Sequence, residues 1–231
     1  MAQSGLAHTL KWLGIGNGLL YLAGRVLQKI SGNRACIIRY RFVAQPVPTE
    51  APALATGGAT RIWQAASDDP IVAAFPRPQS VIAKRFSDDG HCFVAQSKDA
   101  FAGFLWLARG GYEEDEVRCH YALARPDRTA WDYDVYIAPR FRLGRMFTRL
   151  WQSANHYLRA QGIDWTLSRI STFNADSLAA HARLGARSLG HATFIVIGPL
   201  QLSVLSMAPY LHLSLSATSR PVVSLAPPSG D

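Results

Sequence analysis

The stretch that decides the fold runs from Val135 to Phe147 and reads Val-Tyr-Ile-Ala-Pro-Arg-Phe-Arg-Leu-Gly-Arg-Met-Phe. Its apolar start completes a strand predicted for Trp131 to Ile137, which Ala138-Pro139 closes. Apolar residues at helical spacing follow at once and predict a helix from Gly144 to Gln161. The sequence therefore places a short basic loop between a strand and a long helix.

This loop carries three arginines, Arg140, Arg142 and Arg145, beside Gly144. The first N–H groups of a helix have no partner inside it, and the helix dipole adds partial positive charge there. Glycine lets a phosphate approach the backbone closely, and a guanidinium donates two hydrogen bonds at once. The pattern predicts a pyrophosphate cradle, and an ordinary connection with solvated arginines stays open as the alternative.

The composition narrows the class of protein. The chain has 231 residues, of which 48% are hydrophobic and 17% charged, so it can bury a core. Its net charge of +8 fits nucleic acid, anionic lipid or a phosphate-bearing small molecule. We expect no nucleic acid partner, because the arginines are dispersed and not interleaved with aromatic residues. Three scattered cysteines, Cys36, Cys92 and Cys119, argue against a disulfide framework or a cysteine-based metal site and favour a cytoplasmic location.

The first 30 residues have two interpretations. Apolar spacing from Leu6 to Ile30 is helical, and the glycines between Gly14 and Gly18 weaken its middle. The favoured interpretation is a helix, a break and a second helix docked on the domain. The alternative is a peripheral membrane contact through residues 6–30, with Lys11, Arg25 and Lys29 near anionic headgroups. We expect neither a signal peptide nor a membrane-spanning segment.

Strands alternate with helices along the rest of the chain, which predicts a mixed α/β domain. We expect an N-terminal helical segment at 1–35, the domain at 36–215 and a loose tail at 216–231. A linker or surface loop is predicted for Gln45–Thr60. The other predicted strands are Cys36–Val43, His91–Gln96, Phe101–Leu107, Val117–Leu123, Trp165–Ser171, Ser188–Ile197 and one within Gln201–Leu215, with helices within Asp68–Phe86 and from Asn174 or Asp176 to Leu184.

The segment order resembles the acetyl-CoA-binding motif of the GNAT acyltransferase superfamily. Ile137-Ala138-Pro139 looks like its first element and Arg142-Leu143-Gly144 like its loop. The resemblance is close from Trp131 to Ile197, although Arg145 and Phe147 stand where the family motif has small residues. It implies a mostly antiparallel sheet with helices on both faces, and acetyl-CoA or another acyl-CoA as co-substrate. The residues it implies for cofactor binding are Ile137, Arg142, Leu143, Gly144, Arg145, Met146, Phe147 and Asn174.

Two residues are candidates for proton transfer. The resemblance places a general acid seven residues after Asn174, which is His181, and a packed structural histidine is the alternative. For a base, simple alternation puts Asp132 and Asp134 on one face of their strand, and we expect Asp134 because it is nearer the expected cleft. A solvated edge carboxylate is the alternative for Asp134. His120, His156 and His191 have no metal-ligand spacing with cysteines or acids, so we expect no metal.

The sequence thus predicts a GNAT-like N-acyltransferase that moves an acyl group, acetyl first, directly from acyl-CoA to an amine. The acceptor is a small-molecule or lipid-like amine, and the oligomeric state stays open. The acidic run Glu113–Glu116 is interpreted as a solvated turn, with attraction of a cationic acceptor as the alternative. The alternative function is a non-catalytic acyl-CoA-binding or membrane-surface interaction protein.

Overall fold

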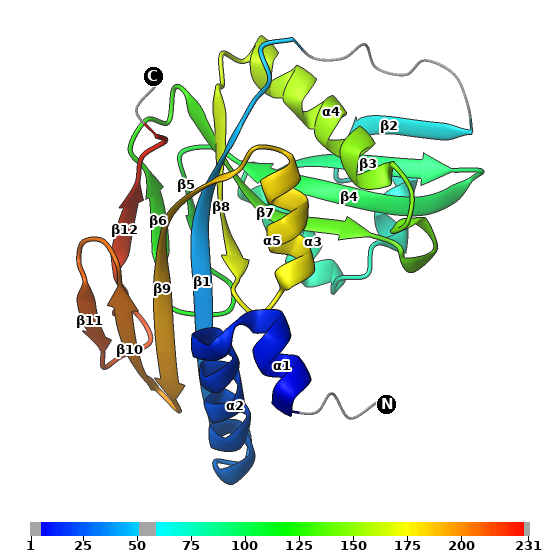
Figure 1. Cartoon of the computed structure of the whole chain (residues 1–231). Coiled ribbons are helices and arrows are strands. Elements are labelled where there is room, and N and C mark those ends of the chain that lie inside the picture. The colour runs from blue at the N-terminus through cyan, green and yellow to red at the C-terminus, as the bar shows by residue number, and fades with distance from the viewer. Residues whose placement is uncertain (1–5, 51–58, 229–231) are drawn as a thin grey trace. The chain divides into compact units, whose positions relative to one another are not determined.

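The computed structural model describes residues 6–50 and 59–228 (Figure 1). Residues 51–58, within the predicted linker, lie outside the described part, as do 1–5 and 229–231 at the two ends. The chain divides into two compact units. Unit 1 comprises residues 1–45, 112–124 and 167–231, and unit 2 comprises residues 46–111 and 125–166.

Unit 1 begins with the predicted pair of helices, α1 (Leu6–Leu13) and α2 (Ile15–Ile30). Gly14 separates them with a φ of 78°, a conformation that favours glycine. Gly18 lets the helices approach closely, because a Cβ there would lie 2.7 Å from a side-chain atom of Leu10. Farther along α2, Gly24 faces Ile37 of the following strand, so α2 packs against the sheet of unit 1.

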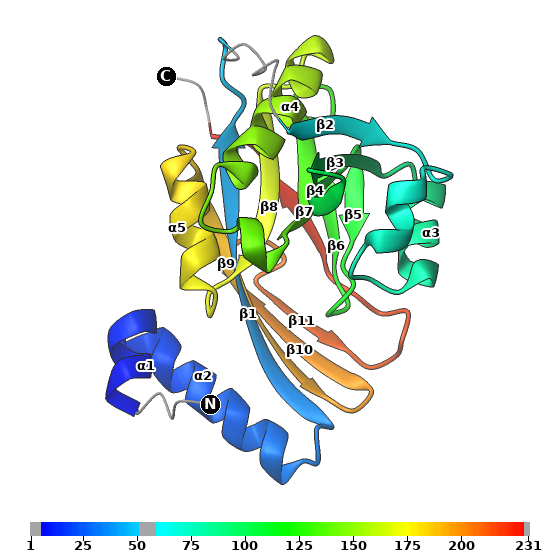
Figure 2. The ribbon, with the colours of Figure 1, turned by 90° about the vertical axis from the view of Figure 1, so that its right-hand side faces the viewer.

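The main sheet of unit 1 is antiparallel where its pairing is described. Its strand order is β11-β10-β9-β1-β8, and α2 and α5 lie on the same side of it (Figures 1 and 2). The elements are β1 (Ala35–Pro46), β8 (Trp165–Ser171), α5 (Ala175–Arg183), β9 (Arg187–Ile197), β10 (Leu200–Leu205) and β11 (Leu211–Ser214).

A three-stranded sheet of order β12-β6-β5 packs against the other side of β1. It consists of β5 (Gly111–Glu113), β6 (His120–Leu123) and β12 (Val222–Leu225), with β12 parallel to β6. The rings of Phe42 on β1 and Tyr121 on β6 meet edge to face with centroids 5.5 Å apart, and both are fully buried. Aromatic burial of this kind holds the two sheets together.

The C-terminal part differs from the sequence expectation. The tail expected to be loose contains β12, whose Val223 and Leu225 are buried. The stretch expected to hold one strand holds two, because a turn closed by the Tyr210 N–H on the Met207 carbonyl separates β10 from β11. Val222–Leu225 alternates between exposed and buried residues, but the serines and prolines around it are typical of a loop. Its partner strand lies about a hundred residues earlier in the chain, so the sequence pattern did not predict the pairing.

Unit 2 is an antiparallel sheet between two helical layers. Its strand order is β7-β4-β3-β2, from β2 (Thr60–Ala65), β3 (His91–Ser97), β4 (Ala100–Ala108) and β7 (Thr129–Ile137). On one face, η1 (Pro70–Ala74) and α3 (Gln79–Ser87) bury Val72, Phe75 and Ile82 against the sheet. On the other face, α4 (Met146–Ala160) brings Tyr157 to Phe93 of β3. The predicted mostly antiparallel α/β fold is confirmed, and no helix within the described ranges is long and apolar enough to cross a membrane.

Candidate functional site

The predicted basic loop forms a tight corner between β7 and α4 in unit 2. The Ala138 N–H bonds the Ala102 carbonyl of β4, which fixes the end of β7. A single 3₁₀ turn, η2 (Pro139–Phe141), follows, and the Gly144 N–H then bonds the Phe141 carbonyl at 3.2 Å. The Arg142 Nε donates to the Ile137 carbonyl at 3.0 Å and so ties the loop back to the strand. The predicted helix begins at Met146, two residues later than expected.

This corner presents positive charge to solvent. Arg140, Arg142 and Arg145 are all exposed, and so are Leu143 and Gly144. A Cβ placed on Gly144 would meet only the Phe141 carbonyl, at an ordinary contact distance of 3.5 Å. The surface over Gly144 is therefore open to an incoming group.

The first turn of α4 anchors the corner. Met146 is buried, and the ring of Phe147 packs edge to face on Trp151 one turn later, with centroids 6.4 Å apart. The Phe147 ring thus lies along α4, against Trp151. Because the backbone N–H groups at a helix start point outward along the axis, α4 adds its dipole to the three guanidinium charges.

Asp134 is held by two arginines of the same unit. Arg77 donates to both carboxylate oxygens at 2.8 and 2.9 Å, and Arg85 donates to Oδ2 at 2.7 Å. The Asp134 side chain is 11% exposed and that of Arg85 is 12% exposed. The guanidiniums also lie over aromatic rings, Arg77 over Tyr136 and Arg85 over Tyr133. Three charge-assisted hydrogen bonds hold this carboxylate in one orientation on β7, and its expected role as a base stays a prediction.

The expectation that Asp132 and Asp134 share one face is wrong. Trp106 of β4 pairs with Asp134, and Leu107 pairs with Asp132, so Tyr133 is an extra residue on β7. This β-bulge breaks the alternation of the strand. Asp132 therefore points to the face opposite Asp134, and it is buried.

His181 lies in unit 1, on α5, and is buried. Its Nδ1 is 3.1 Å from Oε1 of Gln45, an amide oxygen that only accepts, so Nδ1 donates and Nε2 is the acceptor nitrogen of the ring. Burial lowers the pKa of His181 to about 4. The imidazole is consequently neutral near pH 7, which fits a packed histidine better than a general acid.

Asn174 is the N-cap of α5, as the sequence predicts. Its side chain accepts a hydrogen bond from the Ser177 N–H at 3.1 Å. The residue is exposed, and its side-chain oxygen is engaged by the helix it begins. Its predicted contact with a cofactor stays a prediction.

The acidic run is solvated at Glu113, Asp115 and Glu116, which are exposed, and differs from the expectation at Glu114. The Glu114 side chain is fully buried and makes a bidentate pair with Arg169, with distances of 2.7 and 2.8 Å. Burial alone would lower the pKa of Arg169, but the hydrogen bonds and charge of Glu114 raise it. Glu116 accepts from the Tyr40 hydroxyl, and burial together with the charge of Glu114 raises the pKa of Tyr40. Glu114 thus stabilises unit 1 through a buried ion pair with Arg169.

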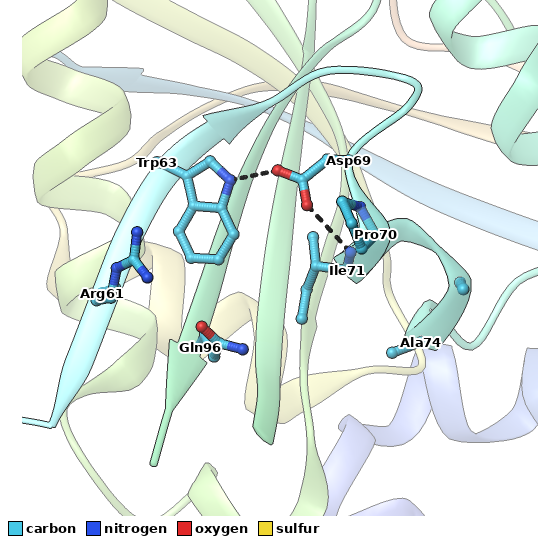
Figure 3. A pocket seen from close by; sticks show the side chains of 8 residues that line it. Arg61, Trp63, Asp69, Pro70, Ile71, Ala74 and Gln96 are labelled. Atoms are coloured by element: carbon cyan, nitrogen blue, oxygen red, sulfur yellow. Dashed lines mark hydrogen bonds between the residues drawn. The ribbon is translucent and has the colours of Figure 1, made fainter. Parts of the chain in front are cut away.

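A pocket of about 680 Å³ lies between β2 and η1 of unit 2 (Figure 3). Trp63 donates to Asp69 at 2.7 Å, and Asp69 caps η1 through the Ile71 N–H at 3.0 Å. Arg61 lies over the Trp63 ring, with Gln96 nearby on β3 (Figure 3). None of the residues predicted for the site lines this pocket.

The structure gathers Asp134 and the residues from Ile137 to Phe147 in unit 2, whereas Asn174 and His181 belong to unit 1. Sequence reasoning missed Arg77 and Arg85, the partners of Asp134. The local feature near them is the pair of prolines around Arg77. These prolines interrupt the helical pattern, so Arg77 looks like an ordinary arginine of a surface loop.

The acetyltransferase (GNAT) family model matches residues 59–186, more than half of the chain and all of the corner. The chain belongs to this family. It is therefore a GNAT-type acyltransferase that uses an acyl-CoA, and the resemblance seen in the sequence is confirmed.

Solved structures resemble the chain at low sequence identity. A functionally unknown protein from Staphylococcus epidermidis is 14% identical, with 75% of this chain and 67% of that chain covered and a TM-score of 0.50. A GNAT family acetyltransferase from Elizabethkingia anophelis with acetyl-CoA bound is 11% identical, covering 55% and 75%, with a TM-score of 0.41. An aminoglycoside acetyltransferase from an uncultured soil metagenomic sample is 14% identical, covering 55% and 87%, with a TM-score of 0.39. These likenesses concern the fold alone, and no curated protein matches the chain.

Proposed function

We propose that this GNAT-type enzyme transfers an acetyl group from acetyl-CoA directly to the amine of a small-molecule acceptor. The observation that carries the proposal is the corner between β7 and α4. There, three exposed arginines lie within four residues of Gly144 in the sequence, its open face is accessible, and a 15-residue helix begins two residues later. Planar guanidiniums and backbone N–H groups are the donors that a pyrophosphate prefers.

The donor set fits the phosphate end of an acyl-CoA. Arg142 and Arg145 would bind the pyrophosphate, and Gly144 would let it reach the backbone at the start of α4. Ile137, Leu143, Met146 and Phe147 would shape and anchor the loop that holds it. Bound acyl-CoA would supply a thioester carbonyl. The amine nitrogen forms the new bond to this carbon, the carbon–sulfur bond breaks, and the CoA thiolate leaves and takes up the proton that the amine loses. Asn174, which belongs to unit 1, stays a predicted cofactor-binding residue.

Direct transfer agrees with the state of the buried cysteines. Burial raises the pKa of the Cys119 thiol to about 12 and that of Cys92 higher still. Since the thiolate is the nucleophile, neither cysteine is suited to carry an acyl group near neutral pH. The acceptor amine itself is then the attacking group.

His181 and Asp134 are the proposed groups for proton movement. Because burial lowers its pKa, His181 is neutral near pH 7 and has no imidazolium proton to donate as a general acid. The two arginines on Asp134 favour a positioning role, in which the carboxylate fixes the bulged part of β7 beside the corner. Asparagine at position 181 can still form hydrogen bonds but does not titrate. We therefore expect the turnover of the unchanged chain to depend on a group with a pKa below neutrality, and this pH dependence to be absent in His181→Asn.

A Gly144→Ala variant tests the cradle. The added methyl group has room in the protein and leaves the fold unchanged, but it occupies the surface a phosphate would approach. We expect acetyl-CoA binding at least about tenfold weaker with an unchanged melting temperature. A Gly110→Ala variant is the control for glycine replacement elsewhere in unit 2. Gly110 has a positive φ, so its replacement should lower the stability of the protein but not its affinity for acetyl-CoA. Unchanged acetyl-CoA affinity in Gly144→Ala would contradict the assignment.

A second function, acyl-CoA binding without catalysis, is favoured by one observation. Both predicted proton-transfer residues are engaged in other contacts, His181 with Gln45 and Asp134 with Arg77 and Arg85. Acetyl-CoA binding without product formation across a panel of small-molecule and lipid-like amines would support this second function. A lipid-like acceptor would agree with the proposed membrane contact of residues 6–30, which expose Trp12, Ile15 and Leu19.

A further inference from the structure

The strands at the far edge of unit 1 have an inverted pattern of burial. In β10, Gln201 and Ser203 are buried, whereas Leu200 and Val204 are exposed. Gln201 faces inward because its amide pairs with the backbone of Arg118, accepting at 2.9 Å and donating at 2.7 Å. Polar groups that are satisfied in this way can be buried. The apolar side of the strand is left facing solvent.

The strand register makes this exposed side continuous. Ile195 on β9 pairs with Leu202 on β10, which pairs with Leu213 on β11. Paired residues point to the same face of a sheet. The neighbouring rows are Ile197 with Leu200, and Val204 with Leu211. The most exposed members are Ile197, Leu200, Val204, Leu211 and Leu213, which are 44% to 63% exposed.

Helix α2 extends the same face. Ile37 of β1 pairs with Ile195 and also meets α2 at Gly24, so the helix lies on the apolar side of the sheet. Figures 1 and 2 show α2 along β1, and among the described helices of unit 1 none lies over β10 and β11. The outer side of α2 carries an exposed stripe at helical spacing, formed by Ile15, Leu19, Ala23, Val26 and Ile30.

The net charge of the protein is concentrated in two segments that contain this face and its neighbouring elements. Residues 1–49 contain six lysines and arginines, residues 177–230 contain three, and neither segment contains an acidic residue. These segments form α1, α2, β1, most of α5, β9, β10, β11 and β12. The remaining residues up to 176 contribute equal numbers of basic and acidic side chains, so the excess positive charge belongs to the two segments.

Basic residues border the apolar rows. Arg34 directly precedes β1 at the Ile197 end, where its carbonyl accepts from the Gly198 N–H. At the opposite end, Arg41 pairs with His191. Arg25 and Lys29 are exposed on α2 beside its stripe. An apolar surface with a basic border is the arrangement of proteins that lie in the interface of an anionic membrane.

We propose that this apolar face, formed by the exposed side of β9, β10 and β11 and the outer stripe of α2, binds the surface of an anionic lipid bilayer. The proposal rests on the membrane contact proposed for residues 6–30 and extends it to the sheet. Apolar side chains enter the boundary between headgroups and acyl chains, and the basic border pairs with lipid phosphates. A second copy of the chain fits less well, since two such faces would bring like charges together.

Co-sedimentation of the full chain with vesicles tests the proposal. The vesicles contain phosphatidylcholine alone, or with about a third phosphatidylglycerol. We expect binding to the anionic vesicles that is about tenfold stronger than to neutral ones and that salt weakens. A sheet variant, Leu211→Ser with Leu213→Ser, and a helix variant, Ile15→Gln with Val26→Gln, should each lower the affinity about tenfold.

The matched control is Val222→Ser, since Val222 is 56% exposed and lies on β12, outside the face. Its vesicle affinity should equal that of the unchanged chain. Melting temperatures of all variants check that they fold. Equal binding of the sheet variant and the unchanged chain overturns the extension to the sheet, whatever the helix variant does. A dimer in sedimentation velocity that the sheet variant dissolves, without vesicle binding, overturns the lipid assignment. Neither result depends on acyl transfer, which is measured separately.

Discussion

Replacement of Asp134 by asparagine should destabilise the protein, because Asp134 is the centre of a nearly buried cluster with two arginines. The carboxylate accepts three hydrogen bonds from Arg77 and Arg85, with distances between 2.7 and 2.9 Å. Removing one partner of a buried ion pair costs about 3–5 kcal/mol, because the other charge is left unpaired. Arg77 is a third exposed, and asparagine keeps one acceptor oxygen, so we expect about 3 kcal/mol.

For a chain of this size, a loss of about 3 kcal/mol lowers the melting temperature by about 6–12 °C. Urea denaturation, followed by tryptophan fluorescence, gives the free energy directly. The control is Asp99→Asn in the same unit. Asp99 is exposed with a φ of 61°, which asparagine also tolerates, so the change should stay within about 0.5 kcal/mol.

A double-mutant cycle adds a second test. Asp134→Asn combined with Arg85→Gln should cost less than the sum of the single changes, by more than about 1 kcal/mol. If Asp134→Asn unfolds with unchanged free energy while turnover is abolished, the positioning role is refuted and the carboxylate acts in the chemistry.

Three further predictions concern the buried His181, the buried Cys92 and Cys119, and the close contact of Gly103 with the backbone of β7. His181 resists protonation in the folded state down to about pH 4, whereas the unfolded chain takes up that proton near pH 6.5; stability should fall by about 3 kcal/mol as the pH drops through this window, and urea titrations should show a smaller fall in His181→Asn. Cys92 and Cys119 should resist alkylation at pH 8 in the native state and react after unfolding, as peptide mass spectrometry would show; rapid native labelling of either would contradict their burial. Gly103→Ala should lose about 2 kcal/mol or more in denaturation experiments, because its Cβ would lie 2.4 Å from the Tyr136 carbonyl; a variant as stable as the original chain would show that β7 yields easily there.

Local signals predicted much of the fold. Proline and glycine mark the limits of the corner between β7 and α4, and Asn174 caps α5 where the sequence places a cap. The glycine at position 14 breaks the N-terminal helices as expected. These features depend on neighbours within a few residues, which a single sequence displays directly.

Partners far apart in the chain were not predictable. Glu114 and Arg169 are 55 residues apart, and Asp134 and Arg77 are 57 residues apart. The acidic run therefore looked solvated, although its second glutamate is buried in an ion pair. The bulge at Tyr133 depends on the pairing of β7 with β4, so simple alternation put Asp132 on the wrong face.

The central claim is that the corner between β7 and α4 binds the phosphates of acetyl-CoA. Calorimetric titration of acetyl-CoA into the unchanged chain, Arg142→Ala and Arg145→Ala tests it most directly, with Arg61→Ala as a control for an exposed arginine elsewhere in unit 2. The account predicts measurable binding that each corner variant weakens about tenfold or more and that the control leaves unchanged. Binding that is absent, or equal in all four proteins, would contradict it.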